Sequence, residues 1–438
     1  MNAQEEYKLK LMSAERAIDY IADQDKIVMG NAVSEPPALL KALAGKIRAG
    51  RYNKLRLFYN ESKSPAGNSI LTYDLLNVLE LNCLFLSSIE RNLIKEGLAD
   101  HKKVVNYVPT TFSQTPRILS EDIGIDTLIT TVSPMNENGY FTFGTNNDYI
   151  TSVARSAKKV IVEVNDLMPR VFGDSLLHIS EVTAVTQHTF PLVEVRPIPA
   201  NAIDDAIGKI IAAHVSDGAT LQMGVGALPN AICSELSGHK DLGIHSEVLT
   251  PGMIDLIKMG AVNNRRKKIN RLKSVFTFVM GNQQLYDFIN DNPAVESYPV
   301  SYVNDPYVIA QNDNVVSVNS TAEIDLTGAC NSEHIKGHQY SSSGGQLDFV
   351  RGAYMSKGGK SFIALHSTTA DGKVSKITGR LSGPVTTPRT DVHYVATEYG
   401  CVNLKGKSSA ERALALISIA HPAFRALLLE SAKKNFLV

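Results

Sequence analysis

Residues 219–230 read ATLQMGVGALPN, an apolar run that ends at Gly224 and is followed at once by a second glycine, Gly226. The run predicts a strand, and Leu228-Pro229 predicts the start of a helix, because proline is favoured in the first helical turn. A glycine loop at a helix start presents backbone N–H groups that can hold a phosphate or an oxyanion. Taken alone, the same pattern is more often a plain tight turn.

A second strand-like run, Leu242–Val248, follows about twenty residues later and carries Glu247 near its end, just before a Pro251-Gly252 turn. In an open α/β sheet, the carboxyl ends of neighbouring strands are where ligands bind. A carboxylate there, beside a glycine turn, has the parts for covalent carboxylate catalysis with an oxyanion hole. The alternative is a solvated surface glutamate. We expect His245 to be a hydrogen-bonded packing histidine rather than a base.

The composition is that of an ordinary globular protein. Of the 438 residues, 44 % are hydrophobic and 20 % are charged, and Lys+Arg and Asp+Glu both count 44, so the net charge is zero. This balance argues against electrostatic binding to nucleic acid or to an anionic membrane. No run approaches the roughly 18 apolar residues of a membrane span, no secretory signal is visible, and the four cysteines lack metal-binding spacing. We therefore expect a cytoplasmic protein without a metal.

Strand-like runs alternate with helix-like runs, which predicts βαβ units and a mainly parallel sheet. The strand candidates of the first half are Lys26–Met29, Lys54–Tyr59, Val104–Val108, Thr127–Val132 and Lys159–Val164. Helix candidates include Pro37–Ile47 and Asp148–Ala157. The pairs Asn138-Gly139 and Asp371-Gly372 predict the turns of two hairpins.

The two halves of the chain also resemble each other. A helix, a strand that ends in glycine and a second helix are predicted twice, at Ala14–Ala22, Lys26–Gly30 and Pro36–Leu40, and again at Ala202–His214, Ala219–Gly224 and Pro229–Ile232. We expect two domains, 1–200 and 201–438, which are related open α/β halves facing each other across a cleft. Coincidence between two common strand–helix openings is the alternative.

The stretch Tyr340–Ala353 is rich in serine and glycine near its start. Its Gly344 and Gly345 would let the backbone approach a ligand closely, and a mobile surface loop is the alternative. The basic run Arg265–Lys273 is typical of a solvated face, with polyphosphate binding as the less favoured interpretation. Dinucleotide binding is disfavoured because Pro229 replaces the third glycine of that motif.

Together these segments resemble the family I coenzyme A transferases, the branch with 4-hydroxybutyrate CoA-transferase, butyryl-CoA:acetate CoA-transferase and the acetyl-CoA hydrolases. The resemblance covers nearly the whole chain. In the first half it rests on Val132–Met135, Asn138–Phe141, Glu163–Asn165 and Met168–Arg170, and in the second half on Gly224–Ala231, Gly243–Glu247, Glu323–Gly328, Ser343–Ala353 and Ala396–Gly400.

The resemblance implies roles for individual residues. Glu247 matches the active-site glutamate of the family. The segment Gln222-Met223-Gly224-Val225-Gly226 matches a loop that contacts CoA and can stabilise oxyanions, Gly344-Gly345 matches a second CoA loop, and Ala322 lies near CoA. Coenzyme A would be the substrate and the covalent partner of the enzyme, and no metal is required.

The reaction implied is transfer of CoA between a short-chain acyl-CoA (4-hydroxybutyryl-, butyryl- or acetyl-CoA) and a carboxylate such as acetate. It would proceed by ping-pong chemistry through a glutamyl-CoA thioester. An acyl-CoA hydrolase that uses the same glutamate is the nearest alternative, and a non-catalytic metabolite-binding regulator is a remote one. The expected partners are these small molecules, not nucleic acid or a membrane, and a homo-oligomer stays open.

Overall fold

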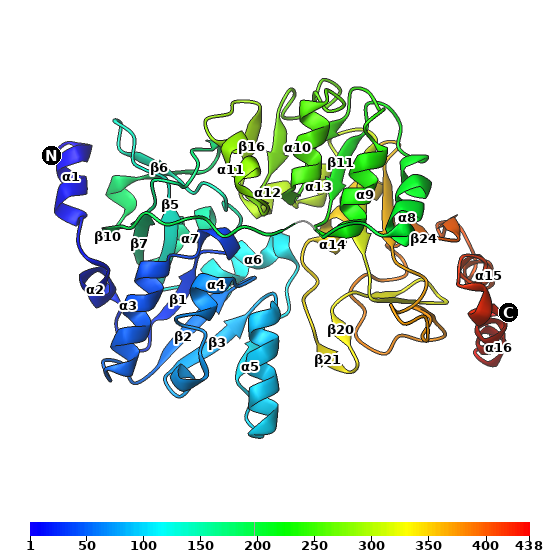
Figure 1. Cartoon of the computed structure of the whole chain (residues 1–438), viewed down its shortest axis with the longest axis horizontal. Coiled ribbons are helices and arrows are strands. Elements are labelled where there is room, and N and C mark those ends of the chain that lie inside the picture. The colour runs from blue at the N-terminus through cyan, green and yellow to red at the C-terminus, as the bar shows by residue number, and fades with distance from the viewer. Residues whose placement is uncertain (197) are drawn as a thin grey trace. The chain divides into compact units, whose positions relative to one another are not determined.

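The computed structural model describes residues 1–196 and 198–438 (Figure 1). Its contacts separate two compact units: Met1–Arg196 with Phe276–Tyr302, called here the first unit, and 198–275 with Val303–Val438, called the second unit. The predicted domains, 1–200 and 201–438, put Phe276–Tyr302 in the second domain, whereas its contacts put it in the first unit. Backbone hydrogen bonds tie this segment to the first unit, since Asn147 and Asp148 both donate to the Thr277 carbonyl, at 3.0 and 3.2 Å.

The first unit contains a seven-stranded sheet with the order β10-β7-β5-β1-β2-β3-β4, in which all neighbouring strands are parallel. Its strands are β1 (Lys26–Met29), β2 (Leu55–Tyr59), β3 (Leu79–Cys83), β4 (Val105–Tyr107), β5 (Thr127–Val132), β7 (Lys159–Val164) and β10 (Ala184–Gln187). Every residue of β5 is buried, including Thr127, Thr130 and Thr131, as expected for a central parallel strand that is covered on both faces.

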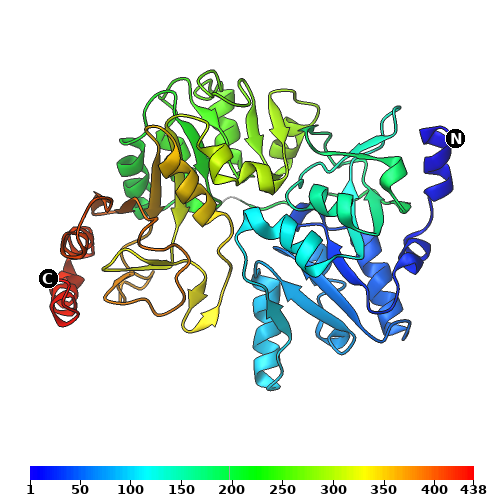
Figure 2. The same cartoon turned by 180° about the vertical axis from the view of Figure 1, so that it is seen from behind.

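Helices cover both faces of this sheet. Helix α3 (Pro37–Arg48) begins at a proline and buries Leu39, Leu40, Leu43 and Ile47; it lies on one face (Figure 1), and α6 (Thr115–Arg117) and α7 (Ile150–Ser156) lie over the other (Figure 2). Further helices of this unit include α1 (Ala3–Lys10), α2 (Ala14–Ala17), α4 (Ser64–Gly67), α5 (Ser88–Ala99) and α11 (Gln283–Ile289). Its smaller strand pairs include β6 (Tyr140–Thr142) with β9 (Leu176–His178), and β8 (Phe172–Gly173) with β16 (Val295–Ser297).

The second unit contains a six-stranded sheet with the order β12-β11-β17-β22-β24-β25. All its pairs are parallel except β24 with β25. Its strands are β11 (Thr220–Met223), β12 (Gly243–Ile244), β17 (Val315–Ser320), β22 (Lys360–Ala364), β24 (Tyr394–Thr397) and β25 (Gly400–Asn403). A smaller sheet is formed by β18 (Glu323–Asp325), β19 (Cys330–Asn331) and β23 (Ile377–Thr378), and β20 (His334–Ile335) pairs with β21 (His338–Gln339).

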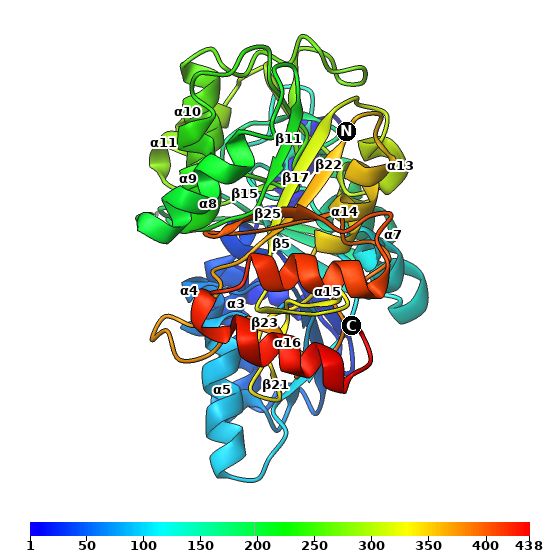
Figure 3. The same cartoon turned by 90° about the vertical axis from the view of Figure 1, so that its right-hand side faces the viewer.

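The side view shows how helices enclose this second sheet (Figure 3). Helices α8 (Ala202–Ala212), α9 (Ala227–Glu235) and α10 (Pro251–Lys258) lie on one side, and α13 (Pro306–Ile309) and α14 (Gln346–Met355) lie on the other. The C-terminal helices α15 (Ser409–Ser418) and α16 (Arg425–Lys434) pack over the apolar cluster that includes Ile363, Val395 and Leu416.

The repeat predicted from the sequence is visible in the strand order. In each sheet the first strand, β1 or β11, is paired on one side with the next strand of its sheet, β2 or β12, and on the other with a strand from much later, β5 or β17. Strands are therefore added on both sides of the first strand of each sheet, and the connections from β1 and β11 to their two neighbours run in opposite directions. Such a switch point leaves room for a ligand at the carboxyl ends of the strands.

The predicted elements agree well with the observed ones. Three strands, β1, β5 and β7, have the predicted bounds, and β2 and β4 differ by one residue at one or both ends. The turn at Asp371-Gly372 is confirmed by the antiparallel bridge of Thr368 to Ser375. At Asn138-Gly139 the chain turns as predicted, since Asn136 donates to the Tyr140 carbonyl at 2.8 Å, but β6 pairs with β9 instead of with the strand before it.

Candidate active site

The loop Gly224–Gly226 joins β11 to α9, as the sequence predicts. Gly226 precedes the helix with φ at +132°, a backbone conformation that only glycine adopts without strain. The space around the loop is open, because a Cβ atom added at Gly224 would meet nothing closer than 3.9 Å and one at Gly226 nothing closer than 4.0 Å. Val225 is 48 % exposed. The loop therefore offers accessible backbone at a helix start, where an anion or an oxyanion can be held.

Glu247 lies directly beside this loop in the fold. Strands β11 and β12 are parallel neighbours, with Leu221 opposite Ile244, and Ser246 Oγ donates a hydrogen bond of 3.4 Å to the Met223 carbonyl. The predicted strand Leu242–Val248 is interrupted before Glu247, because the Ser246 N–H turns to the Val275 carbonyl at 3.0 Å. The interruption places the half-buried Glu247 between β12 and β13 (Val248–Leu249), at the carboxyl edge of the sheet.

The carboxylate of Glu247 lies against Asn304 and Gly345. Asn304 Nδ2 donates to Glu247 Oε2 at 2.6 Å. A Cβ atom added at Gly345 would overlap both Glu247 Oε2 and Asn304 Nδ2, so residue 345 can only be glycine with this geometry. Gly345 is the residue before α14, and the N-terminus of a ten-residue helix favours a nearby negative charge. The structure thus brings together two of the predicted residues, Glu247 and Gly345, from segments about one hundred residues apart.

The other predicted residues border the same edge of the sheet. Gln222 is buried, and its amide exchanges hydrogen bonds with that of Asn319 on the neighbouring strand β17, at 3.4 and 3.2 Å. Met223 is fully buried. Ala322 follows the end of β17 and donates its N–H to the Asn331 carbonyl at 3.0 Å. Gly344 takes a left-handed φ of +52°, which turns the chain into α14.

Asn304 is the residue that sequence reasoning missed. It is fully buried, its Nδ2 reaches Glu247, and its Oδ1 has no hydrogen-bond partner among the described residues. Asparagine before Asp305-Pro306 has the sequence of an ordinary helix cap, and Asp305 does cap α13, accepting from the Tyr307 N–H at 2.7 Å. Only the fold brings Asn304 to the glutamate.

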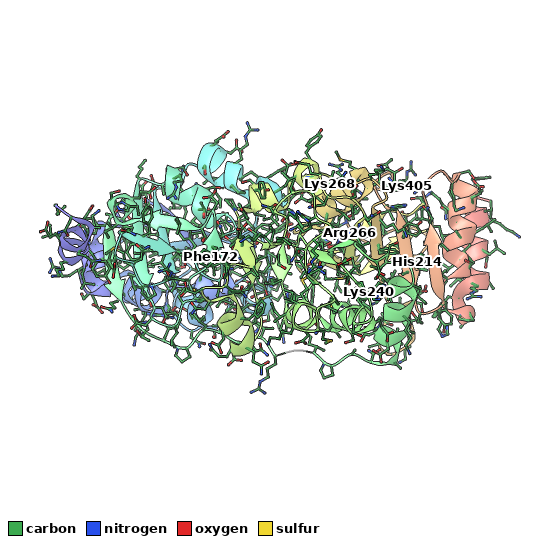
Figure 4. The ribbon with its side chains drawn as sticks, turned by 90° about the horizontal axis from the view of Figure 1, so that it is seen from above. Phe172, His214, Lys240, Arg266, Lys268 and Lys405 are labelled. Atoms are coloured by element: carbon green, nitrogen blue, oxygen red, sulfur yellow. The ribbon has the colours of Figure 1, made fainter. Side chains whose placement is uncertain are left out.

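The basic run Arg265–Lys273 divides into outward and inward residues. Arg266 and Lys268 belong to the second unit, as labelled in Figure 4, and their side chains are 71 % and 59 % exposed, paired with Asp241 and Asp313. Lys267 is 3 % exposed and points inward. The interpretation as a solvated face is therefore correct for Arg266 and Lys268 and wrong for Lys267.

Three further results bear on the kind of site. Within the described residues, no group of three or more His, Cys, Asp and Glu side chains is arranged to hold a metal ion. Across the same part of the chain, no helix combines the length and apolar sequence needed to cross a membrane. All four cysteines are free thiols. What the site does contain is a carboxylate that accepts a hydrogen bond from an amide, beside a glycine loop with accessible backbone, and these parts suit covalent carboxylate chemistry on an acyl carbonyl.

Comparisons with known proteins agree with this chemistry. The N-terminal domain of acetyl-CoA hydrolase/transferase matches residues 1–197, and the C-terminal domain of the same family matches residues 281–432. The 4-hydroxybutyrate coenzyme A transferase of Clostridium kluyveri is 42 % identical, over 100 % of both chains. The butyryl-CoA:acetate CoA-transferase of Anaerostipes caccae is 36 % identical, over 99 % of this chain and 98 % of that protein.

Solved structures of similar proteins lead to the same family. RipA from Yersinia pestis is 55 % identical with a TM-score of 0.97, covering 100 % of both chains. The 4-hydroxybutyrate CoA-transferase from Porphyromonas gingivalis is 34 % identical with a TM-score of 0.81, covering 99 % of this chain and 100 % of that one. The chain therefore belongs to the acetyl-CoA hydrolase/transferase family, within the family I CoA-transferases. The resemblance found in the sequence, the α/β fold class and the assignment as a CoA-transferase enzyme are confirmed.

Proposed function

We propose that this chain transfers CoA between a short-chain acyl-CoA and a free carboxylate, with Glu247 as the covalent carrier. The observation that carries the proposal is the Glu247 carboxylate, held by Asn304 Nδ2 at 2.6 Å and facing a glycine, Gly345, where no side chain fits. The glycine lets the backbone of residue 345 pack directly against the carboxylate, which any side chain at that position would prevent. Coenzyme A is the substrate that relatives of this family share.

The proposed reaction has two half-reactions. A Glu247 oxygen attacks the thioester carbonyl, the C–S bond breaks, and a mixed anhydride and CoA thiolate form. The thiolate then attacks the glutamyl carbonyl, the anhydride C–O bond breaks, and the free acid leaves behind a glutamyl-CoA thioester. An incoming carboxylate reverses both steps, so the enzyme returns to its starting state and no thioester is lost to water.

The side chain of Asn304 has a distinct role in these steps. Its Nδ2–H group donates to Glu247 Oε2 at 2.6 Å, and we assign the attack on the thioester to Oε1. When the thiolate adds to the glutamyl carbonyl, negative charge develops on the oxygen that faces Asn304. A preorganised donor at such an oxygen contributes roughly 3–4 kcal/mol to the transition state. The amide therefore both orients the nucleophile and stabilises the second oxyanion.

We assign the CoA-binding surface to the glycine loops and their borders. Gln222, Met223, Gly224, Val225 and Gly226 would contact CoA and the first oxyanion, and Gly344, Gly345 and Ala322 would line the second side. The open space at Gly224 and Gly226 supports this assignment. The names of the relatives favour 4-hydroxybutyryl-, butyryl- or acetyl-CoA as donors and acetate as an acceptor. We further propose a cytoplasmic enzyme that needs no metal and acts on small molecules alone, with homo-oligomer formation left to experiment.

Exchange of CoA between two acids tests the proposal. Purified protein is incubated with butyryl-CoA or 4-hydroxybutyryl-CoA, with and without acetate, while acetyl-CoA and free CoA are both measured. A transferase makes acetyl-CoA in proportion to the donor consumed, shows parallel lines in double-reciprocal plots, and releases little free CoA without acetate. Release of free CoA at the same rate without acetate would instead establish the hydrolase, a function that a more distant relative from Schizosaccharomyces pombe carries in its name.

A further inference from the structure

Asn304, which donates the hydrogen bond to Glu247, is fixed in turn by contacts of its neighbours in the chain. The chain enters the second unit for the second time at Val303, directly before Asn304. The Val303 carbonyl accepts a hydrogen bond of 2.8 Å from His245 Nε2. On the other side of Asn304, Asp305 caps helix α13. Asn304 is therefore held from both sides, by His245 through the preceding peptide and by the helix that follows.

His245 is well suited to this task. It is fully buried, and its own N–H bonds to the Leu221 carbonyl of β11 at 3.1 Å, so its backbone is part of the central sheet. Because a carbonyl can only accept, Nε2 must carry the proton of this ring. Only Ser246 separates His245 from Glu247 in the sequence, so one short segment supplies both the nucleophile and the anchor for the amide that orients it.

Lys267 binds the residue directly before His245. Its buried ammonium donates to the carbonyl of Ile244 at 2.8 Å and to that of Lys273 at 2.7 Å. Gly243 leaves room for the lysine stem, since an added Cβ there would lie 2.8 Å from Lys267 Cγ. Burial, and then the charge of Lys267, lower the pKa of His245 to about 3. The imidazole is consequently neutral near pH 7.

We propose that His245 is a positioning residue for the transferase reaction: its Nε2–H holds the Val303 carbonyl, and this bond keeps Asn304 in place against the Glu247 carboxylate. Lys267 anchors the strand that presents His245. The inference rests on the proposed function, because it gives His245 a part in a reaction assigned to Glu247. The proposed role requires a hydrogen-bond donor at the position of Nε2, and a side chain of the right size without a donor would not fulfil it.

The test begins with three single variants of the purified enzyme. In His245→Leu the side chain keeps its bulk but loses the donor; in His245→Gln an amide N–H reaches the position of Nε2. His393→Leu is the matched control, since His393 is another buried histidine of the second unit and precedes β24 at the amino edge of the sheet. Measured for each are kcat, KM for the acyl-CoA, the rate of glutamyl-CoA formation in a single turnover, and Tm.

We expect His245→Leu to lower kcat and the rate of glutamyl-CoA formation by about 10- to 100-fold, because small misplacements of reacting groups cost up to about 100-fold. KM should change little, His245→Gln should restore most of kcat, and His393→Leu should turn over like the wild type. The double variant His245→Leu/Asn304→Ala should be no slower than Asn304→Ala alone, since His245 acts only through Asn304. If His245→Leu does not fold, His245→Asn, whose amide is too short to reach Val303, takes its place.

Several outcomes would overturn the inference. The first is a folded His245→Leu enzyme that forms glutamyl-CoA at the wild-type rate. The second is a double variant in which the losses of kcat from His245→Leu and Asn304→Ala add up. The third is a loss of kcat in His393→Leu as large as that in His245→Leu. The proposed function fails separately, and in a different measurement. If wild-type enzyme turns over acyl-CoA without modification of Glu247, the nucleophile is misassigned whatever the His245 variants do.

Discussion

The first strands of the two sheets, β1 and β11, hold the same place in two related halves, yet the loops that follow them differ. After β1, a Cβ atom added at Gly30 would overlap the Ser34 carbonyl, and Asn31, Ala32, Val33 and Ser34 are all buried. After β11, the space around Gly224 and Gly226 is open. The glycine of the first unit serves tight packing, and those of the second leave backbone accessible.

The carboxylates near these loops differ in the same way. Glu35 of the first unit is fully buried, and its two oxygens accept the backbone N–H groups of Lys63 at 2.7 Å and Ala66 at 2.9 Å. Burial raises the pKa of Glu35 well above its usual value. Glu247 is only half-buried and meets a side-chain amide and a bare glycine. Each half thus has a glutamate near a glycine loop; Glu35 binds buried backbone, and Glu247 is the one to which we assign chemistry.

Exchanging the two glutamates for alanine is the largest test of this contrast. Glu247→Ala should lower kcat by about 10³-fold or more, as loss of a covalent nucleophile does, with Tm close to that of the wild type. Glu35→Ala leaves two backbone N–H groups buried without an acceptor and should destabilise the fold by about 2–5 kcal/mol. Denaturant unfolding and steady-state kinetics on both variants separate the effects, and a Glu247→Ala enzyme with near-normal kcat would end the comparison.

Gly345→Ala should have the next largest effect. The new methyl group would overlap the Glu247 carboxylate and the Asn304 amide, so the carboxylate must move, and a displacement of about 1 Å can cost about 100-fold in rate. Gly238→Ala is the matched control, since nothing lies within 4 Å of a Cβ atom added at Gly238. Equal kcat values for the two variants would mean that the close approach of Gly345 to Glu247 is not needed.

Alanine substitutions at Gly30 and Gly224 should have smaller effects, on stability in the first case and on substrate binding in the second. Gly30→Ala should destabilise the protein by about 1–3 kcal/mol, because the methyl group must be forced into packed backbone. Gly224→Ala should change the unfolding free energy by less than about 0.5 kcal/mol and instead raise KM for acyl-CoA. Thermal unfolding and a KM measurement suffice, and a destabilised Gly224→Ala protein with normal KM would reverse the assignment of an open loop.

The last prediction is a dependence of stability on pH that is weak above pH 6.5. The pKa of His245 is lowered to about 3, so the unfolded chain takes up a proton below about pH 6.5 that the folded chain does not. This residue's contribution is full above pH 6.5 and falls by about 1.4 kcal/mol per pH unit between pH 6.5 and 3. The free energy of unfolding of wild type should therefore drop more steeply than that of His245→Gln between pH 7 and 5. Parallel curves would show that His245 is not held neutral.

The parts of this account that could be predicted from sequence are those that local patterns encode. Apolar runs ending in glycine located β1 and β11, and Pro37 marked the start of α3, because these signals lie within a few residues of one another. The position of Glu247 at a strand end, together with the family resemblance, was enough to propose the nucleophile. His245 was predicted to be a hydrogen-bonded packing residue, and its bond to Val303 confirms this.

The remaining residues could not be predicted because contacts between distant segments define them. Asn304 is 57 positions from Glu247, and its sequence context is that of a helix cap. Lys267 stands in a run of cations that otherwise face solvent, and nothing in the run marks which one is buried. Strand β3 (Leu79–Cys83) was also missed, since Glu80 and Asn82 interrupt its apolar pattern. The course of Phe276–Tyr302 into the first unit likewise follows from tertiary contacts alone.

The covalent intermediate on Glu247 is the central claim, and trapping it is its most direct test. Enzyme is mixed with an acyl-CoA in the absence of an acceptor acid, treated with hydroxylamine or borohydride, and digested, and the peptide that spans Glu247 is examined by mass spectrometry. We predict stoichiometric modification at Glu247 that requires the acyl-CoA, is lost in Glu247→Ala, and disappears when excess acetate is added first. Full transferase activity with an unmodified Glu247, or modification of a different residue, would contradict the account.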